Sequence, residues 1–591
     1  MSSRTYLGIF ENHFDPAVAA VRDGEVIAYA EEERFIRQKH AYRVFPIRAL
    51  NFCLDRAGIG PDEVSAIGVN WDLKGFADGR IAGFFDDMAA EWDLDDRTTG
   101  WQRFMLANYN ENAFRARLAG HWQRNFGAVP LPPLHVVPHH FAHALHAYLR
   151  SGFDEALCLT IDGSGDEHCT VMWECRGEDI RPMREFTMPH SLGWFYAAFT
   201  EYLGFQAYDG EYKVMGLAAY GRANAELRRK VETILSPAED GIGYRLDPKY
   251  IHYGPRSWSD RFTDHLPDLF GRPMRLDHDP IEDWHEDLAF EVQHALEESV
   301  CRLARHGLTE MRTRNLCIGG GVGLNVKMNS KLFELDAVGD IFPQPLCSDG
   351  GAAEAVALAA CWQLDGARPA QQRTLALGNE HSDEEIEAAL RLCGIAFEQP
   401  DDIAEAVADE LADGKVVGWF QGRMEAGPRA LGQRSILADP RNEAMRDKVN
   451  AVIKYREYWR PFCPSMPAEA APDYLEEHTD APFMIIAFRA KEKLRQQAPA
   501  IVHVDGTVRV QLVDGDVLPL YHRLLAAFGR RSGVPVLLNT SFNVKGEPVV
   551  CTIQDALRTF FSTGLDVLAA GGYLVRKPAT PVAPEYKAER G

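Results

Sequence analysis

The fold is decided by three short apolar runs near the N-terminus: Tyr6-Leu-Gly-Ile-Phe10, Ala17-Val-Ala-Ala-Val21 and Val26-Ile-Ala-Tyr-Ala30. Each run has the length and composition of a β-strand. The polar loop Glu11-Asn-His-Phe-Asp-Pro16 separates the first two runs, and Asp23-Gly24 before the third is a strong hairpin signal. The sequence therefore predicts that the chain opens with neighbouring strands of one sheet.

Helical patterns alternate with further strand-like runs along the first part of the chain. Additional strands are predicted at residues 66–69, 134–137, 156–161 and 316–318. This alternation is typical of an α/β fold whose sheets are fed from several segments. Glycine-rich turns near Gly163 and Gly319 would suit a duplicated nucleotide-binding core.

The length of 591 residues exceeds what one hydrophobic core supports, so several domains are expected. A linker-like stretch precedes a new amphipathic helix, and Ser382 followed by Glu385 forms a capping box that marks the start of this helix. We predict an α/β domain at 1–370, a second α/β domain at 371–576 and a flexible, proline-rich tail at 577–591.

The formal charge of −23 disfavours a nucleic-acid or anionic-membrane partner, because such partners need a broadly basic surface. The eleven cysteines include no CxxC pair, which indicates reduced thiols. The N-terminus lacks the long apolar segment of a signal peptide, and no uncharged apolar run is long enough to span a bilayer. We expect a cytoplasmic monomer or homodimer that binds neither nucleic acid nor membrane.

Two histidines and two aspartates form a candidate metal site. His139 and His143 stand four residues apart at the start of a predicted helix, so their imidazoles share one face and could chelate one divalent ion. Asp162 follows a predicted strand, and Asp349 precedes a helix of small residues. Such a donor set suits iron(II) or manganese better than a structural zinc ion. The alternative is four unrelated polar residues at helix and strand ends.

A glycine-rich turn follows the strand predicted at 316–318. The segment Cys317-Ile-Gly-Gly-Gly-Val-Gly-Leu-Asn325 would let backbone N–H groups approach phosphates or a nucleoside. It is neither a Walker A loop nor a clean dinucleotide-binding fingerprint, and a tight packing turn is the alternative. Glu211 and Lys213 lie beside another apolar, glycine-rich stretch, where they either face a pocket or form an exposed ion pair.

Cations are concentrated in one part of this acidic chain. The stretch contains Arg423, Arg429, Arg434, Arg441, Arg446, Lys448, Lys454, Arg456 and Arg460. Its arginines are interleaved with glycine, proline and tryptophan, unlike an evenly solvated helix face, and guanidinium groups suit bidentate contacts to phosphate. A small polyphosphate is therefore favoured over nucleic acid as the bound anion. Residues 538–547 either add neutral hydrogen bonds to this anion or form a polar loop after a buried strand.

Stretches spread along nearly the whole chain resemble the NodU/CmcH-type O-carbamoyltransferases, which modify nodulation factors and antibiotics. They include Glu31-Glu-Glu-Arg-Phe-Ile-Arg-Gln-Lys-His40, His139-His-Phe-Ala-His-Ala144, Gly427-Pro-Arg-Ala-Leu-Gly432, 162–166, 212–218, 319–325, 454–465 and 538–546. The stretches occur in the order of the family. The resemblance is therefore specific and covers both predicted domains.

The resemblance implies a duplicated N-terminal domain of the actin/Hsp70/sugar-kinase type and a C-terminal YrdC-like domain. In the family, the YrdC-like domain cleaves carbamoyl phosphate and joins the carbamate to the α-phosphate of ATP, which is used with Mg²⁺, so that pyrophosphate is released. The N-terminal domain then holds the carbamoyl-adenylate at an iron site for attack by an acceptor hydroxyl. The expected acceptor is a small-molecule natural product, as in antibiotic or other secondary metabolite biosynthesis.

The resemblance also implies roles for individual residues. The implied metal ligands are His139, His143, Asp162 and Asp349, in agreement with the donor pattern. The implied contacts to the adenylate and carbamoyl phosphate are Arg429, Lys454, Arg460 and Ser541, with Arg423, Arg434 and Asn543 as neighbours. Lys454 and Arg460 are expected to act in catalysis. The remaining nucleotide contacts are expected from Gly320, Gly321, Asn325, Glu211 and Lys213.

Two catalytic roles in the N-terminal domain are hypotheses. His13, in the loop after the first strand, is the candidate base that takes the proton of the acceptor hydroxyl, and Lys39 would steady the carbamoyl oxygen. The family often has His-Asp in this loop, whereas here Phe14 separates His13 from Asp15. The aromatic residues of 71–126 are expected to be mostly helix core, with some forming the acceptor pocket.

Three other functions account for parts of the sequence. A sugar-kinase-like ATPase leaves the basic stretch without a role, and a tRNA threonylcarbamoyl-type enzyme needs a basic surface for RNA. A non-enzymatic iron-binding regulator also gives the basic stretch no role. Carbamoyl-phosphate-dependent ATP–pyrophosphate exchange without tRNA or sugar would separate the carbamoyltransferase from all three.

Overall fold

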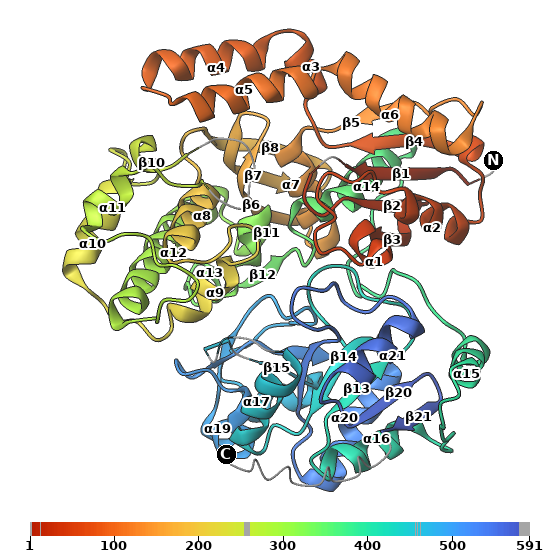
Figure 1. Ribbon diagram of the computed structural model, residues 1–591. Helices are drawn as coiled ribbons and strands as arrows, with labels where there is room; N and C mark the ends of the chain where they lie inside the picture. Colours follow the sequence, from red (N-terminus) through yellow and green to blue (C-terminus); the bar gives the residue numbers. More distant parts are fainter. Residues whose placement is uncertain are drawn as a thin grey trace, which may run out of the picture.

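A computed structural model of the protein describes residues 3–11, 13–252, 260–454, 457, 459, 460 and 462–577. Figure 1 shows two lobes, with the N-terminal part of the chain (red to green) above the C-terminal part (teal to blue). Arg456 and the tail at 578–591 lie outside the described residues, so the flexible tail stays a prediction.

The first sheet is built from the strands that open the chain. Its order is β3-β2-β1-β4-β5, with β1 antiparallel to β2 and parallel to β4. The strands are β1 (Thr5–Phe10), β2 (Ala17–Arg22), β3 (Glu25–Glu31), β4 (Val64–Val69) and β5 (Leu134–Val136). Arg22 pairs with Glu25 across the turn, and Asp23 and Gly24 both have positive φ, as a two-residue hairpin turn requires. The predicted hairpin is confirmed.

The second sheet repeats the topology of the first. Its order is β8-β7-β6-β11-β12, and β6 is antiparallel to β7 and parallel to β11. The strands are β6 (Glu155–Gly165), β7 (His168–Arg176), β8 (Asp179–Thr187), β11 (Asn315–Gly319) and β12 (Asp340–Pro343). Because strand order and direction match those of the first sheet, the structure confirms the predicted duplicated α/β domain.

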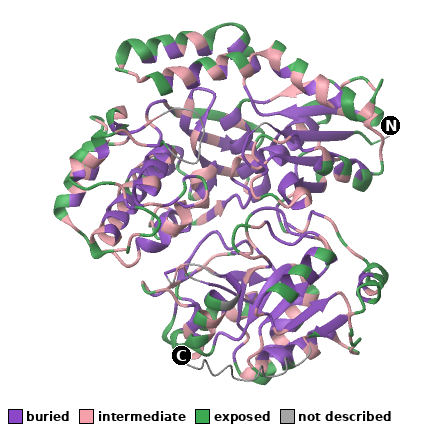
Figure 2. Cartoon of the chain, viewed as in Figure 1, coloured by how far each residue is buried: buried purple, intermediate pink, exposed green. Residues whose placement is uncertain are grey.

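Two helices lie between the sheets, and each packs on the sheet of the other half. Helix α7 (His139–Ser151) follows β5 but packs on β6 and β11, whereas α14 (Ala352–Asp365) follows β12 but packs on β1, β2 and β4. The two helices also contact each other, and the first ten residues of α14 are buried (Figure 2). This arrangement brings the start of α7 close to the loop before α14.

Four helices are inserted between β4 and β5. They are α3 (Leu73–Ala77), α4 (Arg80–Glu91), α5 (Asp96–Asn108) and α6 (Glu111–Phe126). The buried aromatic residues of 71–126 are Trp71, Phe76, Phe85, Trp101, Tyr109, Phe114 and Trp122. The others, Phe84, Trp92, Phe104 and Phe126, are half-buried. The prediction that most of these rings are helix core is confirmed.

The C-terminal lobe is built on one seven-stranded sheet, β18-β15-β19-β14-β13-β20-β21. Its strands are β13 (Val417–Phe420), β14 (Arg434–Ala438), β15 (Cys463–Pro467), β18 (Gln511–Val513), β19 (Leu537–Ser541), β20 (Val567–Ala570) and β21 (Tyr573–Arg576). Helices α16 (Ile403–Ala412) and α20 (Pro519–Ser532) pack together against it. Ser382 and Glu385 exchange two hydrogen bonds at the start of α15 (Asp383–Leu392), which confirms the predicted capping box.

The eleven cysteines are free thiols, and all but Cys393 are buried, as the absence of paired motifs predicts. Within the described part of the chain, the helices are either too short or too polar to cross a membrane.

Gly8 of β1 allows α14 to pack directly on the first sheet. A Cβ atom on Gly8 would lie 1.8 Å from the carbonyl oxygen of Ala353, whereas a Cβ on Gly100 of α5 would meet no described atom within 4 Å. We predict that Gly8→Ala lowers the free energy of unfolding by about 1–3 kcal/mol, because α14 must shift away. Gly100→Ala should leave it unchanged or raise it by up to about 1 kcal/mol. Urea unfolding followed by circular dichroism measures both, and equal effects would contradict the packing argument.

Candidate functional site

The four predicted metal ligands meet at the N-terminal end of α7. Their ligand atoms all lie within 4.8 Å of one another. Nε2 of His143 is 3.1 Å from Nε2 of His139 and 3.4 Å from Oδ2 of Asp162. Nε2 of His139 is 3.5 Å from Oδ1 of Asp349, which begins the short helix η4 (Asp349–Gly351). Two imidazole nitrogens and two carboxylate oxygens at these distances could hold one divalent cation.

The glycine turn after β11 holds Asp162 in place. The N–H of Gly321 donates to Oδ2 of Asp162 at 3.0 Å, and the N–H of Gly163 donates to Oδ1 at 2.7 Å. Gly320 has a φ of 80°, and a Cβ on it would lie 2.4 Å from the carbonyl oxygen of Ile161. Gly320 therefore allows the turn to approach β6. Gly321, and not Gly320, lines a cavity that borders Asp162.

His139 is held by groups outside the four ligands. The amide of Asn70 lies 3.2 Å from its Nδ1, and its backbone N–H donates to Oδ2 of Asp166 at 3.1 Å. Burial lowers the pKa of His139, but Asp162 and Asp349 outweigh burial and raise this pKa overall. Burial raises the pKa of Asp162, but both histidines outweigh it and hold this pKa well below its usual range. The four side chains thus favour a positive charge between them. Either a proton on the imidazoles or a bound metal ion can supply this charge.

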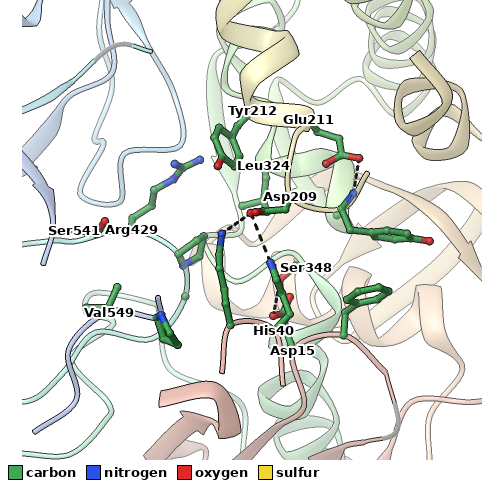
Figure 3. A pocket seen from close by; sticks show the side chains of 18 of the residues that line it. Asp15, His40, Asp209, Glu211, Tyr212, Leu324, Ser348, Arg429, Ser541 and Val549 are labelled. Carbon is green, nitrogen blue, oxygen red and sulfur yellow. Dashed lines mark hydrogen bonds and ion pairs between the residues drawn. The ribbon is translucent and has the colours of Figure 1, made fainter. Parts of the chain in front are cut away.

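A cavity of about 650 Å³ extends from Asp162 and Asp349 of this ligand set to the C-terminal lobe. Figure 3 shows residues of both lobes around it. Nδ1 of His13 lies 3.4 Å from Oδ2 of Asp349, so the candidate base stands beside the metal ligands. The predicted residues that line the cavity are His13, Lys39, Asp162, Glu211, Lys213, Gly321, Asn325, Asp349, Arg429, Lys454, Arg460, Ser541 and Asn543. Residues predicted in different domains therefore face one space.

The C-terminal side of the cavity is a cationic wall that includes Arg429, Lys454 and Arg460. Nζ of Lys454 lies 3.2 Å from Oγ of Ser541 and 2.8 Å from Oδ1 of Asn543, so three predicted residues form one cluster. Nε of Arg429 is buried and has no hydrogen-bond partner among the described residues. Burial and the neighbouring guanidinium of Arg509 lower the pKa of Arg429 to about 9. A bound anion would give Nε of Arg429 a hydrogen-bond partner and would offset the repulsion between the two guanidinium groups.

Two arginines predicted as neighbours of the phosphate contacts lie elsewhere. Arg423 donates to the carbonyl oxygen of Ile27 at 3.0 Å, and Arg434 donates to that of Gly422 at 3.0 Å. Neither belongs to the described residues that line the cavity. The expectation for these two arginines is corrected, because their guanidinium groups bind backbone carbonyls and hold the fold together.

Glu211 and Lys213 line the cavity with separate partners. The carboxylate of Glu211 accepts hydrogen bonds from the N–H groups of Tyr208 at 2.9 Å and Gly210 at 3.2 Å. Nζ of Lys213 lies 3.1 Å from Oε1 of Glu457, across the cavity. Glu211 therefore shapes the loop before α9 (Glu211–Leu217), and Lys213 forms an ion pair with the other lobe.

Lys39 belongs to a network of charged residues that no pattern in the sequence indicated. Nζ of Lys39 lies 2.5 Å from Oδ1 of Asp209, and Nδ1 of His40 lies 2.9 Å from Oδ1 of Asp15 (Figure 3). Burial lowers the pKa of His40, but Asp15 and Asp209 outweigh burial and raise it to about 10. His40 and Asp209 stand within or beside stretches that carry the resemblance, but their spacing does not reveal that they meet.

Known proteins match the chain along most of its length. The family described as Carbamoyltransferase N-terminus matches residues 5–360, and Carbamoyltransferase C-terminus matches residues 408–577. The nodulation protein NolNO of Sinorhizobium fredii is 36% identical over 95% of this chain and 79% of its own. The 3′-hydroxymethylcephem-O-carbamoyltransferase of Amycolatopsis lactamdurans is 34% identical over 46% of this chain and 51% of its own.

An uncharacterized protein of Synechocystis sp. is 37% identical over 97% of both chains. Among solved structures, HypF of T. kodakarensis is 13% identical over 62% of this chain and 48% of its own. Its TM-score of 0.32 is too low to support an argument.

We predict that His143→Ala weakens divalent-ion binding by more than about 100-fold, because it removes a ligand from the set. Equilibrium dialysis of metal-free protein against Mn(II), followed by metal analysis, measures the affinity. His135→Ala is the control, because His135 lies outside the set and contacts Gln363 at 2.7 Å. Equal binding by both variants would contradict the site.

We predict that His40 stabilises the fold through a charge that is lost at high pH. Its pKa in the folded protein, about 10, lies above its ordinary value of 6.5, so the stabilisation is complete below pH 6.5 and is lost as the pH rises through about 10. The difference in unfolding free energy between wild type and His40→Gln should therefore shrink from neutral pH to pH about 10. Urea unfolding at both pH values tests this, and a constant difference would refute it.

Proposed function

The chain belongs to the carbamoyltransferase family, and from that premise we propose how its two lobes divide the reaction. The protein is an O-carbamoyltransferase that transfers a carbamoyl group to a hydroxyl of a small molecule. In our proposal, residues 371–576 form a YrdC-like domain that makes a carbamoyl-adenylate, and residues 1–370 transfer its carbamoyl group. One observation carries the proposal: Asp162 and Asp349 of the metal-ligand set and the cationic wall border the same cavity.

The activation step belongs to the cationic wall. Water attacks the phosphorus of carbamoyl phosphate, the bond from this phosphorus to the carbamoyl oxygen breaks, and carbamate leaves with the electron pair while phosphate forms. A carbamate oxygen then attacks the α-phosphorus of ATP, supplied with Mg²⁺. The bond from that phosphorus to the bridging oxygen breaks, and pyrophosphate leaves with the electron pair. Carbamoyl phosphate, carbamate, ATP and pyrophosphate are anions, so Lys454, Arg429 and Arg460 hold them together and stabilise the charge that develops. Ser541 and Asn543 add neutral hydrogen bonds beside Lys454.

The transfer step belongs to the N-terminal lobe. The acceptor hydroxyl attacks the carbamoyl carbon, the bond from this carbon to the AMP oxygen breaks, and AMP leaves with the electron pair. His13 takes the hydroxyl proton, and its Nδ1 lies 3.4 Å from Oδ2 of Asp349, which orients the ring. Lys39, held by Asp209, donates to the carbamoyl oxygen. A divalent ion held by His139, His143, Asp162 and Asp349, which we propose to be Fe(II), would polarise the carbamoyl group when bound.

The relatives and the cavity support a natural product as the acceptor. The relatives' names point to nodulation and to a cephem alcohol, and both support a natural product with a free hydroxyl. The cavity has room for such a molecule next to the adenylate. A panel of hydroxylated metabolites, incubated with the protein, ATP and carbamoyl phosphate and examined by mass spectrometry, would identify the acceptor.

We predict that substitutions separate the two steps. Lys454→Met should lower carbamoyl-phosphate-dependent ATP–pyrophosphate exchange by about 100-fold or more, because it removes a charge that stabilises the anions. Asp349→Asn should retain exchange and lose carbamoyl transfer to the accepted hydroxyl compound. Arg441→Ala is the matched control, because Arg441 belongs to the same basic stretch but pairs with Asp439 at 2.7 Å. The proposal would be refuted if ATP–pyrophosphate exchange did not depend on carbamoyl phosphate, or if Lys454→Met retained the wild-type rate of exchange.

A further inference from the structure

We propose that Glu31, Arg34 and Arg37 form a cross-lobe clamp that protects the activated carbamoyl group from water. The inference rests on the two-step reaction proposed above. Glu31 ends β3, Arg34 lies in α1 (Glu32–Ile36), and Arg37 ends α1 with a φ of 59°. This short segment of the N-terminal lobe binds two loops of the C-terminal lobe, and both loops line the cavity.

The first loop is bound at Gly427, two residues before Arg429. Oε1 of Glu31 accepts a hydrogen bond from the N–H of Gly427 at 2.7 Å, and Nη2 of Arg34 donates to its carbonyl oxygen at 2.6 Å. Nε of Arg34 lies 3.3 Å from Oε2 of Glu31, so one buried ion pair binds both polar groups of a single residue. Gly427 has a φ of 81°, and a Cβ on it would lie 2.7 Å from Cδ2 of Leu346. The lobes therefore touch at this point.

The second loop is bound by Arg37. Its Nη1 donates to the carbonyl oxygen of Val549 at 2.7 Å and its Nη2 to that of Pro548 at 2.8 Å. Its Nε lies 3.3 Å from Oδ1 of Asp555. Both Nη nitrogens of the guanidinium group thus donate to the loop that follows Asn543, and Nε faces the next helix, α21 (Ile553–Ser562). Charge-assisted hydrogen bonds of this kind are about twice as strong as neutral ones.

The position of the clamp links the two half-sites. The loops that it binds carry Arg429 and Asn543, which belong to the cationic wall. Two residues after Arg37 the chain reaches Lys39, which lies in the cavity beside Asp209.

The clamp matters because carbamoyl-adenylate reacts with water as well as with an alcohol. Water attacks the carbamoyl carbon, the bond to the AMP oxygen breaks, and AMP leaves with the electron pair. The carbamic acid that remains decomposes to carbon dioxide and ammonia. By holding the two lobes together, the clamp keeps water away from this carbon until the acceptor binds. The clamp residues therefore position the loops and take no part in bond making.

The test uses the full-length protein without any acceptor. For each variant, carbamoyl-phosphate-dependent ATP–pyrophosphate exchange and the release of AMP are measured in parallel. Arg37→Ala should retain exchange, while the ratio of AMP release to exchange rises on the order of tenfold, the change expected from losing hydrogen bonds to a charged group. Arg37→Lys retains the charge and can restore part of the binding, so its ratio should lie between those of Arg37→Ala and wild type.

Arg176→Ala is the matched control, because Arg176 also donates to a backbone carbonyl, that of Met311 at 2.8 Å, but within the N-terminal lobe. Its ratio should equal that of wild type. A ratio in Arg37→Ala equal to that of the control would overturn the clamp, as would a parallel loss of exchange and AMP release. A wild-type protein without exchange would instead refute the proposed function, so the two failures are distinguishable.

Discussion

The close packing of α7 and α14 between the two sheets is the constraint on which the rest of the structure depends. Gly8 and Gly68 bring β1 and β4 so near to α14 that a Cβ on either would collide with backbone carbonyls of the helix. Because α7 packs on the opposite sheet and against α14, the start of α7 and the loop before α14 meet. His139, His143 and Asp349 therefore converge on the end of β6, where Asp162 stands. The candidate metal site is a consequence of how two repeated halves exchange their last helices.

The cavity balances two opposite electrostatic requirements. On the N-terminal side, half-buried carboxylates and buried imidazoles favour a shared positive charge, which the raised pKa of His139 and the lowered pKa of Asp162 reflect. On the C-terminal side, neighbouring guanidinium groups lower the pKa of Arg429 and favour a negative charge. A carbamoyl-adenylate suits both sides, because its phosphate is an anion and its carbonyl oxygen can approach a cation. An overall charge of −23 is compatible with this wall, because only the local charge acts on a buried ligand.

The contacts between the lobes keep the two charged sides of the cavity next to each other. The cationic wall and the metal ligands belong to different lobes, so a product of one step is near the other step only while the lobes stay together. Arg34 and Arg37 bind backbone groups of the loops that carry the cationic wall. Lys213 and Glu457 add an ion pair across the same cavity. The two steps that we propose therefore depend on polar contacts that lie outside both sets of reacting groups.

Local patterns in the sequence determined the elements and the kinds of groups that form the site. Asp23-Gly24 specified a hairpin because both residues tolerate positive φ, Ser382 and Glu385 specified a helix start, and the spacing of His139 and His143 specified a shared helix face. These properties depend on a few neighbouring residues. Tertiary structure alone decided which arginine faces the cavity. Arg423, Arg429 and Arg434 stand in one run, yet only Arg429 lines the cavity, because the other two bind backbone carbonyls. Likewise, the meeting of Lys39 with Asp209 joins residues far apart in the chain, and their distance is set by packing that no local pattern records.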